Sequence, residues 1–290
     1  MRIAHIIVAH KNPDQLQRLI KRLEHNNFDI FIHLDKKTDI TPFKKLEQLK
    51  NVTFIKNRMK CSWGGNNFLI GIFNSIREVL SNNKEYDFIN LISGQDYPIQ
   101  SADVIYNFFK DRKGYNFISY EEDQNSEWLK LAAMRYEKYH LTDFDFKGKH
   151  LFERALNIVA PKRKFPTSYK LYGGPKATWW TITGECAVKI TELMSTNDKL
   201  NNFLKYCWGA DELIIPTLVM HTSDKSKVVN NNLRYIDWSE GNAHPKMLKS
   251  SDFDKIINSK NIFARKFDSE IDDAVLNEID SADFQIELPR

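Results

Sequence analysis

Cysteine is scarce in this 290-residue chain: Cys61, Cys186 and Cys207 stand far apart, and none forms a CxxC pair. Three isolated cysteines build no disulfide framework, so a reducing compartment is expected. Long hydrophobic runs are also missing. The first residues enter a strand-like pattern without a signal-peptide region, and no run approaches the roughly 20 residues of a transmembrane helix. We therefore expect a cytoplasmic protein.

Several motifs of nucleotide and metal chemistry are absent. The chain has no GxGxxG, GxxxxGK[ST], HExxH or GxSxG, and its eight histidines show no ligand spacing. The net charge of +4 is too small to argue for nucleic acid, but it suits a polyanionic small ligand or a loose contact with an anionic membrane. The phosphates of any bound nucleotide must therefore be neutralised by side chains or by a divalent ion.

Short apolar runs alternate with helical patterns through the first half of the chain. This alternation predicts an α/β fold with a mostly parallel sheet covered by helices on both faces. Strands are expected at 3–9, 29–34, 52–55, 88–92 and 116–120, and helices at 13–25, 41–49, 66–80 and 101–114. We expect one domain, 1–290, with a nucleotide-binding half at 1–120 and an acceptor and catalytic half at 121–290. Ligands of such sheets bind beyond the carboxyl ends of the strands. That rule places His10, Asp35, Arg58 and Ser93–Asp96 near one crevice.

The second half is more irregular and more aromatic. The stretch 121–150 is polar without a sustained period and is interpreted as a long active-site loop. A short amphipathic helix at 151–160 is flanked by basic residues, and it could be a plain surface helix or a contact with anionic lipid. Further strands are expected at 178–182 and 232–238, and helices at 186–194, 200–206 and 212–220.

Two adjacent carboxylates, Asp211 and Glu212, follow a Trp-Gly-Ala turn where the apolar run 213–220 begins. Acids in the first turn of a helix feel the positive end of its dipole, which favours their ionised form. Glu212 is therefore a candidate general base, although both acids could simply cap the helix.

Two ways of neutralising phosphates remain open. The Asp143-Phe144-Asp145 and Asp252-Phe253-Asp254 segments could hold a metal ion, since hard cations prefer carboxylate oxygens. Alternatively, Arg234, Arg265 and Lys266 could supply fixed positive charge to a departing diphosphate.

An ordered series of segments carries a resemblance to a known family. It comprises Val8-Ala9-His10-Lys11, Ile32-His33-Leu34-Asp35-Lys36, Leu91–Ile99, the Gly173–Trp180 turn, Asp211-Glu212, Leu233–Trp238, His244-Pro245-Lys246 and Phe263–Asp268. In this order and nearly end to end, the chain resembles the core-2/I-branching β-1,6-N-acetylglucosaminyltransferases and the peptide O-xylosyltransferases. We expect it to differ from the animal enzymes in having no membrane anchor and no disulfide-forming cysteines.

The resemblance implies a GT-A-like fold and inverting transfer from a UDP-sugar without a metal ion or other cofactor. The expected donor is UDP-N-acetylglucosamine, with UDP-xylose next, and the expected acceptor is an oligosaccharide or lipid-linked glycan. Glu212 becomes the catalytic base, and Arg234 and Lys266 meet the diphosphate. Val8, His10 and Asp35 hold the nucleotide, joined by Arg58 at the crevice, while Asp96, Trp180 and Asp211 belong to the sugar and acceptor site. The alternatives are a metal-dependent transferase of the same fold and a catalytically silent glycan- or nucleotide-binding module.

Overall fold

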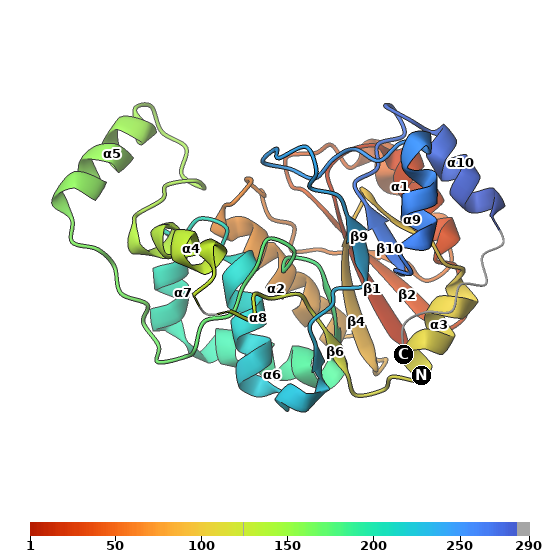
Figure 1. Ribbon diagram of the computed structural model, residues 1–290, viewed down its shortest axis with the longest axis horizontal. Coiled ribbons are helices and arrows are strands. Elements are labelled where there is room, and N and C mark those ends of the chain that lie inside the picture. Colours follow the sequence, from red (N-terminus) through yellow and green to blue (C-terminus); the bar gives the residue numbers. More distant parts are fainter. Residues whose placement is uncertain (124, 283–290) are drawn as a thin grey trace.

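The computed structural model describes residues 1–123 and 125–282, and its centre is a seven-stranded sheet (Figure 1). The strand order is β3-β2-β1-β4-β7-β6-β8. β1, β2, β3 and β4 run parallel, whereas β7 runs antiparallel to β4 and β6. The strands are β1 Ile3–Ala9, β2 Phe28–Leu34, β3 Val52–Phe54, β4 Phe88–Ser93, β6 Asn116–Phe117, β7 Trp180–Thr183 and β8 Val228–Val229. The predicted α/β class with a mostly parallel sheet is confirmed.

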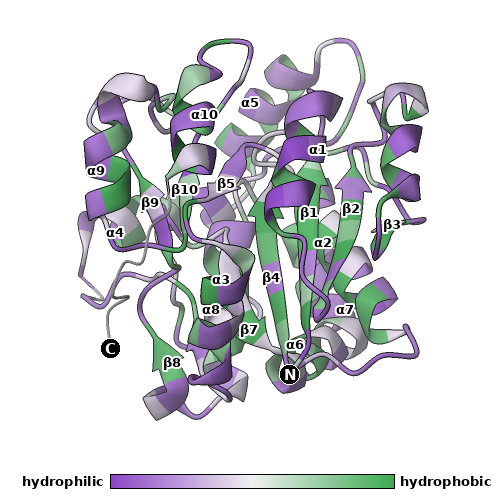
Figure 2. Ribbon diagram, turned by 90° about the vertical axis from the view of Figure 1, so that its right-hand side faces the viewer, coloured by the Kyte–Doolittle hydropathy of each residue, from purple (hydrophilic) through white to green (hydrophobic). Residues whose placement is uncertain are grey.

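Helices cover both faces of this sheet because its central strands are apolar on both sides. Ile3 and Ile7 of β1 belong to one hydrophobic core, and Ala4 and Ile6 belong to the other. Figure 2 shows these apolar strands between helices with hydrophilic outer surfaces. One layer comprises α1 Pro13–Arg22, η1 Thr41–Gln48, α3 Ala102–Lys110, α9 Phe253–Asn258 and α10 Ala274–Ser281; the other comprises α2 Asn66–Leu80, α6 Gly184–Thr196, α7 Asp198–Leu204 and α8 Asp211–Thr222. Short 3-10 turns lie at η2 Lys225–Lys227 and η3 Ser250–Asp252.

A second sheet of three short strands was not predicted. Its order is β5-β10-β9, formed by β5 Asp96–Pro98, β10 Phe263–Arg265 and β9 Arg234–Ile236. The sequence of β5 resembles a turn, because three residues are too few to show the alternating pattern of a strand. In this sheet Asp96 is the register partner of Arg265, and Phe263 is the partner of Arg234. The small sheet therefore brings late-chain arginines to the end of β4.

The expected loop at 121–150 contains a helix, α4 Glu127–Glu137, so that prediction is wrong for this part of the stretch; position 124 lies outside the described residues. Ser126 caps α4, its Oγ accepting a hydrogen bond of 3.2 Å from the Leu129 amide. Only Ala132 of this helix is buried. A helix that buries so little needs no apolar stripe, which is why no helical pattern is visible in the sequence here. The next helix, α5 Lys149–Val159, confirms the short helix expected at 151–160. Within 1–123 and 125–282, no helix is long and apolar enough to cross a membrane.

Candidate active site

The carboxyl ends of β1, β2 and β4 meet at one edge of the large sheet. The Asp35 amide donates a hydrogen bond of 2.8 Å to the Ala9 carbonyl, and the Gly94 amide donates one of 2.8 Å to the Val8 carbonyl. The Thr38 hydroxyl donates to the carbonyl of His10. The structure thus brings together the sequence-predicted nucleotide-binding residues of three strand ends.

Asp35 and Arg58 both shape the loop after β2. The Asp35 carboxylate accepts hydrogen bonds from the amides of Lys37 at 2.9 Å and Cys61 at 3.4 Å. The Arg58 guanidinium donates to the carbonyls of Leu34, Asp35 and Thr38 at 2.8 to 2.9 Å. Arg58 is therefore engaged with the main chain, which leaves it a structural role at this edge.

His10 is exposed beside two lysines. Partial burial, together with the positive charges of Lys11 and Lys266, lowers the pKa of His10. The imidazole is therefore neutral at pH 7, and its ring nitrogens can donate one hydrogen bond and accept another.

Lys266 adds a second cation at the same edge. Burial and the nearby charges of Arg265 and Lys11 lower its pKa. Lys11 forms an ion pair with Asp268, but none of the described residues pairs with the Lys266 ammonium. An ammonium crowded by like charges favours the arrival of an anion.

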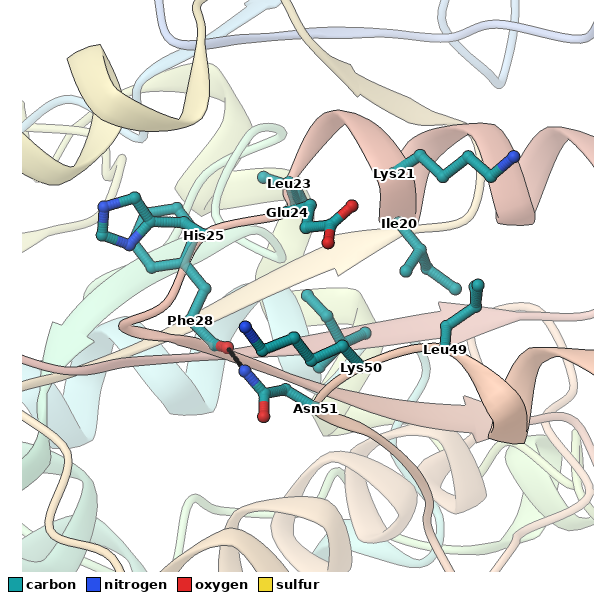
Figure 3. Close-up of a pocket in the computed structure, with 10 residues that line it drawn as sticks. Ile20, Lys21, Leu23, Glu24, His25, Phe28, Leu49, Lys50 and Asn51 are labelled. Atoms are coloured by element: carbon teal, nitrogen blue, oxygen red, sulfur yellow. Dashed lines mark hydrogen bonds between the residues drawn. The ribbon is translucent and has the colours of Figure 1, made fainter.

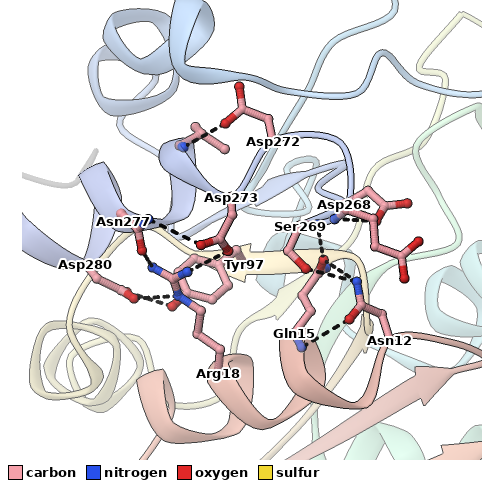
Figure 4. A network of polar contacts seen from close by, with 12 residues as sticks. Asn12, Gln15, Arg18, Tyr97, Asp268, Ser269, Asp272, Asp273, Asn277 and Asp280 are labelled. Carbon is pink, nitrogen blue, oxygen red and sulfur yellow. Dashed lines mark hydrogen bonds and ion pairs between the residues drawn. The ribbon is translucent and has the colours of Figure 1, made fainter.

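The C-terminal segment is held against the edge by the network of Figure 4. The Gln15 side chain donates to the carbonyls of Gly94 at 3.0 Å and Phe267 at 3.2 Å, and it accepts from the Ser269 amide at 2.7 Å. Arg18 binds Asp273 and Asp280 of the same segment at 2.9 and 2.8 Å. These contacts place Lys266 beside the end of β1, more than two hundred residues earlier in the chain.

Behind this edge lies a buried charge cluster. The Asp96 carboxylate accepts from the Ser93 amide at 3.0 Å and faces Arg265, with 3.3 Å between Oδ1 and Nε. Arg234 is 4 % exposed and donates to Asn90 Oδ1 at 2.5 Å and to the Leu91 and Trp180 carbonyls at 2.9 and 3.3 Å. Burial raises the pKa of Asp96 and lowers the pKa of Arg234 to about 9, which leaves this arginine charged at pH 7. Arg234 and Asp96 thus lie inside the protein, behind the surface that Lys266 reaches.

Glu212 lies in the first turn of α8, as predicted, but the helix dipole does not dominate its ionisation. Burial, followed by the neighbouring charge of Asp211, raises the pKa of Glu212 to about 7, against the opposing charge of Arg135. The expectation that the helix start keeps the pKa of Glu212 low is corrected: burial of the carboxyl group raises this pKa. A carboxyl group with this pKa is well matched to general-base catalysis near neutral pH.

Asp211 does not cap the helix. The N-cap residue is Ala210, which offers no side-chain acceptor, and the buried Asp211 carboxylate instead accepts a hydrogen bond of 2.7 Å from the Thr178 hydroxyl. This bond fixes the start of α8 to the segment that leads into β7. Asp211 therefore supports the position of Glu212.

Arg135 of α4 is a site residue that the sequence did not indicate. Its guanidinium forms an ion pair with Glu212 Oε2 and lies over the rings of Trp208 and Trp128, with 4.6 and 5.1 Å from Cζ to the ring centroids. The Arg135 carbonyl also accepts a hydrogen bond of 3.0 Å from the Trp208 amide. Because α4 falls in the stretch expected to be a loop, no pattern connected it with Asp211-Glu212.

Tryptophans of different segments surround this ion pair. Trp63 is 70 % exposed and meets Trp208 edge to face, with 4.9 Å between ring centroids. Gly64 has a φ of +71°, and a Cβ there would overlap the Trp208 ring, so glycine is required for this close approach. The exposed Trp63 provides a flat apolar face on which sugar C–H groups can lie.

Trp180, which was expected at the sugar and acceptor site, is completely buried in the core, at 0 % exposure. Its neighbour Trp179, which precedes β7, is partly exposed. Arg265 lies over the Trp179 ring, 4.6 Å from its centroid. Trp180 is thus not brought to the crevice, and Trp179 lies between Arg265 and Thr178, which binds Asp211.

Short segments join the nucleotide edge to Glu212. The Cys61 amide binds Asp35, while the Gly64 carbonyl accepts a hydrogen bond of 2.8 Å from the Gly209 amide just before α8. Thr178 and Trp179 make the second connection, from Asp211 to Arg265. The carboxylate and the cations are therefore parts of one region.

Both Asp-x-Asp segments have local structural roles. Asp143 Oδ2 accepts a hydrogen bond of 2.7 Å from the Asn67 amide at the start of α2, and Asp252 Oδ1 accepts one of 2.6 Å from Lys246. Residues 1–123 and 125–282 contain no group of three or more His, Cys, Asp or Glu side chains that could hold a metal ion.

Figure 3 shows a pocket at the opposite end of the sheet, near the amino ends of β2 and β3. It has room for about 60 Å³ and is lined by Ile20, Lys21, Leu23, Glu24, His25, Phe28, Ile30, Leu49, Lys50 and Asn51. Ligand sites usually measure about 300–1,000 Å³, so this pocket is too small for a nucleotide sugar.

Comparison with known proteins shows the family. The family model of the Core-2/I-Branching enzyme matches residues 3–260. Human xylosyltransferase 1 is 24 % identical over 304 residues, covering 97 % of this chain and 30 % of its own length, and human xylosyltransferase 2 is 25 % identical over 305 residues, covering 97 % and 33 %. The chain thus spans about a third of these relatives. Among solved structures, mouse xyloside xylosyltransferase 1 in its apo form has a TM-score of 0.39 at 9 % identity, covering 83 % of this chain and 90 % of its own. With a match over most of its length, the chain belongs to the Core-2/I-Branching enzyme family, a family of glycosyltransferases.

Proposed function

We propose that the protein is an inverting, metal-independent glycosyltransferase that moves a sugar from a UDP-sugar to a glycan hydroxyl, with Glu212 as the general base. The observation that carries the proposal is a half-buried carboxylate with a pKa near neutrality, joined through Thr178 and Trp179 to a surplus of cations. The carboxylate can take a proton from the acceptor, and the cations can stabilise the negative charge of the departing diphosphate.

The chemistry needs only one carboxylate. Glu212 removes the proton from the acceptor hydroxyl, whose oxygen attacks the anomeric carbon while the bond to UDP breaks on the opposite face. Arg135 occupies Oε2 of Glu212, so the proton goes to Oε1. UDP departs without needing an acid, and its charge is met by Lys266 directly and by the field of Arg265 and Arg234 behind it. A glycosidase would instead need two opposed carboxylates.

The proposed metal independence rests on the groups that the site contains. Asp143 accepts a hydrogen bond from the start of α2, and Asp252 accepts one from Lys246. The cations, in contrast, lie at the sheet edge where the diphosphate of a bound nucleotide is proposed to lie. Positive side chains can stabilise a departing diphosphate as a metal ion would.

For the donor, we keep UDP-N-acetylglucosamine and UDP-xylose as the two candidates. The first follows from the family resemblance, and the second is favoured because the curated relatives are named xylosyltransferases. The acceptor is proposed to be an oligosaccharide or lipid-linked glycan that lies along Trp63 and Trp208. A cytoplasmic location stays a prediction.

Calorimetric titration with UDP and with both UDP-sugars tests the proposal. We expect binding in the presence of EDTA, and Lys266→Ala should weaken UDP binding by roughly tenfold to a hundredfold, because a hydrogen bond to a charged group contributes about 1.5–3 kcal/mol. The matched control is Lys189→Ala, which removes an exposed lysine of α6 that pairs with Glu185. Binding that requires a divalent ion, or equal losses in the two variants, would contradict the assignment.

Arg135 gives the pH dependence of transfer a specific signature. If Glu212 is the base, kcat/KM rises with pH through an apparent pKa near 7, because only the ionised carboxylate accepts the proton. The positive charge of Arg135 lowers the pKa of Glu212, so Arg135→Gln should move this rise to higher pH, while Arg135→Lys should keep most of it in place. An unchanged pH profile in Arg135→Gln would exclude this coupling.

A further inference from the structure

Helix α5 stands away from the rest of the molecule (Figure 1), and its apolar side chains are exposed. The exposed fractions are 75 % for Leu151, 56 % for Phe152, 74 % for Ile158 and 80 % for Val159. Together with exposed Ala155, these residues have the i, i+1, i+4, i+7, i+8 spacing of one helix face. None of the 11 residues of α5 is buried.

The polar side of α5 is the side that attaches it to the protein. Glu153 Oε2 accepts a hydrogen bond of 2.7 Å from the Leu141 amide. Asn157 accepts one of 2.8 Å from the Tyr139 amide and donates one of 2.7 Å to the Tyr139 carbonyl. This arrangement is the reverse of an ordinary surface helix, whose apolar face packs inward. The apolar stripe is therefore held outward by specific bonds.

Basic residues frame the stripe. Lys147 precedes the helix, Lys149 begins it, and Arg154 lies within it. Lys164 follows it, as does Lys162, whose exposed ammonium pairs with Glu137 at 2.7 Å. The acids of this stretch are Asp145 and Glu153. Glu153 is already engaged with the Leu141 amide. An apolar helical stripe surrounded by positive charge fits the surface of a bilayer, where anionic headgroups cover an apolar interior.

We propose that α5 binds in the headgroup region of an anionic lipid bilayer, with Leu151, Phe152, Ile158 and Val159 entering the apolar layer and the flanking lysines contacting lipid phosphates. The charge around the stripe favours lipid over a second copy of this chain, because two such faces would bring like charges together. Arg163 is not part of the contact, since it donates to the carbonyls of Lys138 and Tyr206 at 3.1 and 3.0 Å. The binding is independent of the transfer chemistry.

Flotation with vesicles tests this proposal on the full chain. We expect binding to phosphatidylcholine vesicles that contain phosphatidylglycerol, little binding to phosphatidylcholine alone, and weaker binding at higher salt. The double variant Phe152→Glu/Ile158→Glu and the charge variant Lys147→Glu/Lys164→Glu should each lower the bound fraction by at least about tenfold. The matched control is Ile271→Glu, which replaces another exposed apolar residue, 52 % exposed.

Two further measurements keep the outcomes distinct. Circular dichroism and UDP titration should give the same results for every variant as for the unchanged protein, so a failed UDP-sugar assignment would not affect the lipid result. Equal binding to both vesicle types, or binding that survives the double variant, would overturn the proposal. Concentration-dependent dimerisation that the double variant abolishes, without vesicle binding, would show that a second copy covers the stripe instead.

Discussion

Replacing Glu212 by Gln is expected to lower the transfer rate by about 10²–10⁴-fold while leaving UDP binding nearly unchanged. The amide is nearly the same size as the carboxylate and fills the same place above Arg135, but it cannot accept the proton of the acceptor hydroxyl. The loss should therefore appear in kcat. Product formation from each UDP-sugar measures it, and calorimetry with UDP measures the retained affinity.

Glu185→Gln is the matched control for this variant. Glu185 is an exposed acid in the first turn of α6 and pairs with Lys189. It therefore shares the position of Glu212 at the start of a helix but lies outside the candidate active site. We expect full activity in this control. Unchanged turnover in Glu212→Gln would remove Glu212 as the base, and a protein that binds UDP but never transfers sugar would support the silent binding module.

Replacing Arg234 by Ala is expected to destabilise the protein by about 3–5 kcal/mol. The guanidinium donates to Asn90 Oδ1 and to the carbonyls of Leu91, Trp180 and Asn232, and the alanine variant loses all of these buried hydrogen bonds. Asn90 Oδ1 still accepts one from the Thr181 hydroxyl. A cavity next to Phe263 adds to the cost, since Arg234 lies 5.2 Å from the centroid of that ring. Urea unfolding measures the change in the free energy of unfolding.

The control for Arg234 is Arg77→Ala on the exposed side of α2, where the expected change is within about 0.5 kcal/mol. Arg234→Lys separates the roles of this residue. It keeps a charge for the diphosphate but loses the fork of donors, so we expect UDP affinity to be retained better than stability. A stability loss no larger than that of Arg77→Ala would show that the buried network contributes little.

Local patterns were sufficient to predict much of the fold. The Asn12-Pro13 start of α1, the Ser101 cap of α3 and the apolar strands of β1, β2 and β4 follow from residues that are close in the chain. Their periodicity is encoded within a single element, so it can be interpreted without knowing the partner. The convergence of His10, Asp35 and Ser93–Asp96 followed from the same information, because parallel strands place their carboxyl ends at one edge.

Contacts between distant segments could not be obtained this way. A strand was predicted around β9, but β5 and β10 are three residues each and too short for a pattern, and it is the pairing of these two that unites Asp96 and Arg265. Arg135 reaches Glu212 from a helix with no apolar stripe, 77 residues earlier in the chain. Trp180 enters the core because it begins β7 and pairs with Leu91 of β4, whereas Trp179 lies just before the strand.

The Asp-Glu segment at the start of α8 has one property that the local sequence predicts and another that depends on the tertiary structure. The order of residues was enough to place Glu212 in a first helical turn, whereas the choice of Glu212 over Asp211 as the base came from the family resemblance. Its pKa near 7 depends instead on how deeply the carboxyl group is buried and on the charges that Asp211 and Arg135 bring beside it. Ionisation responds to the three-dimensional surroundings of a group, and those are set by packing between segments that the chain keeps far apart.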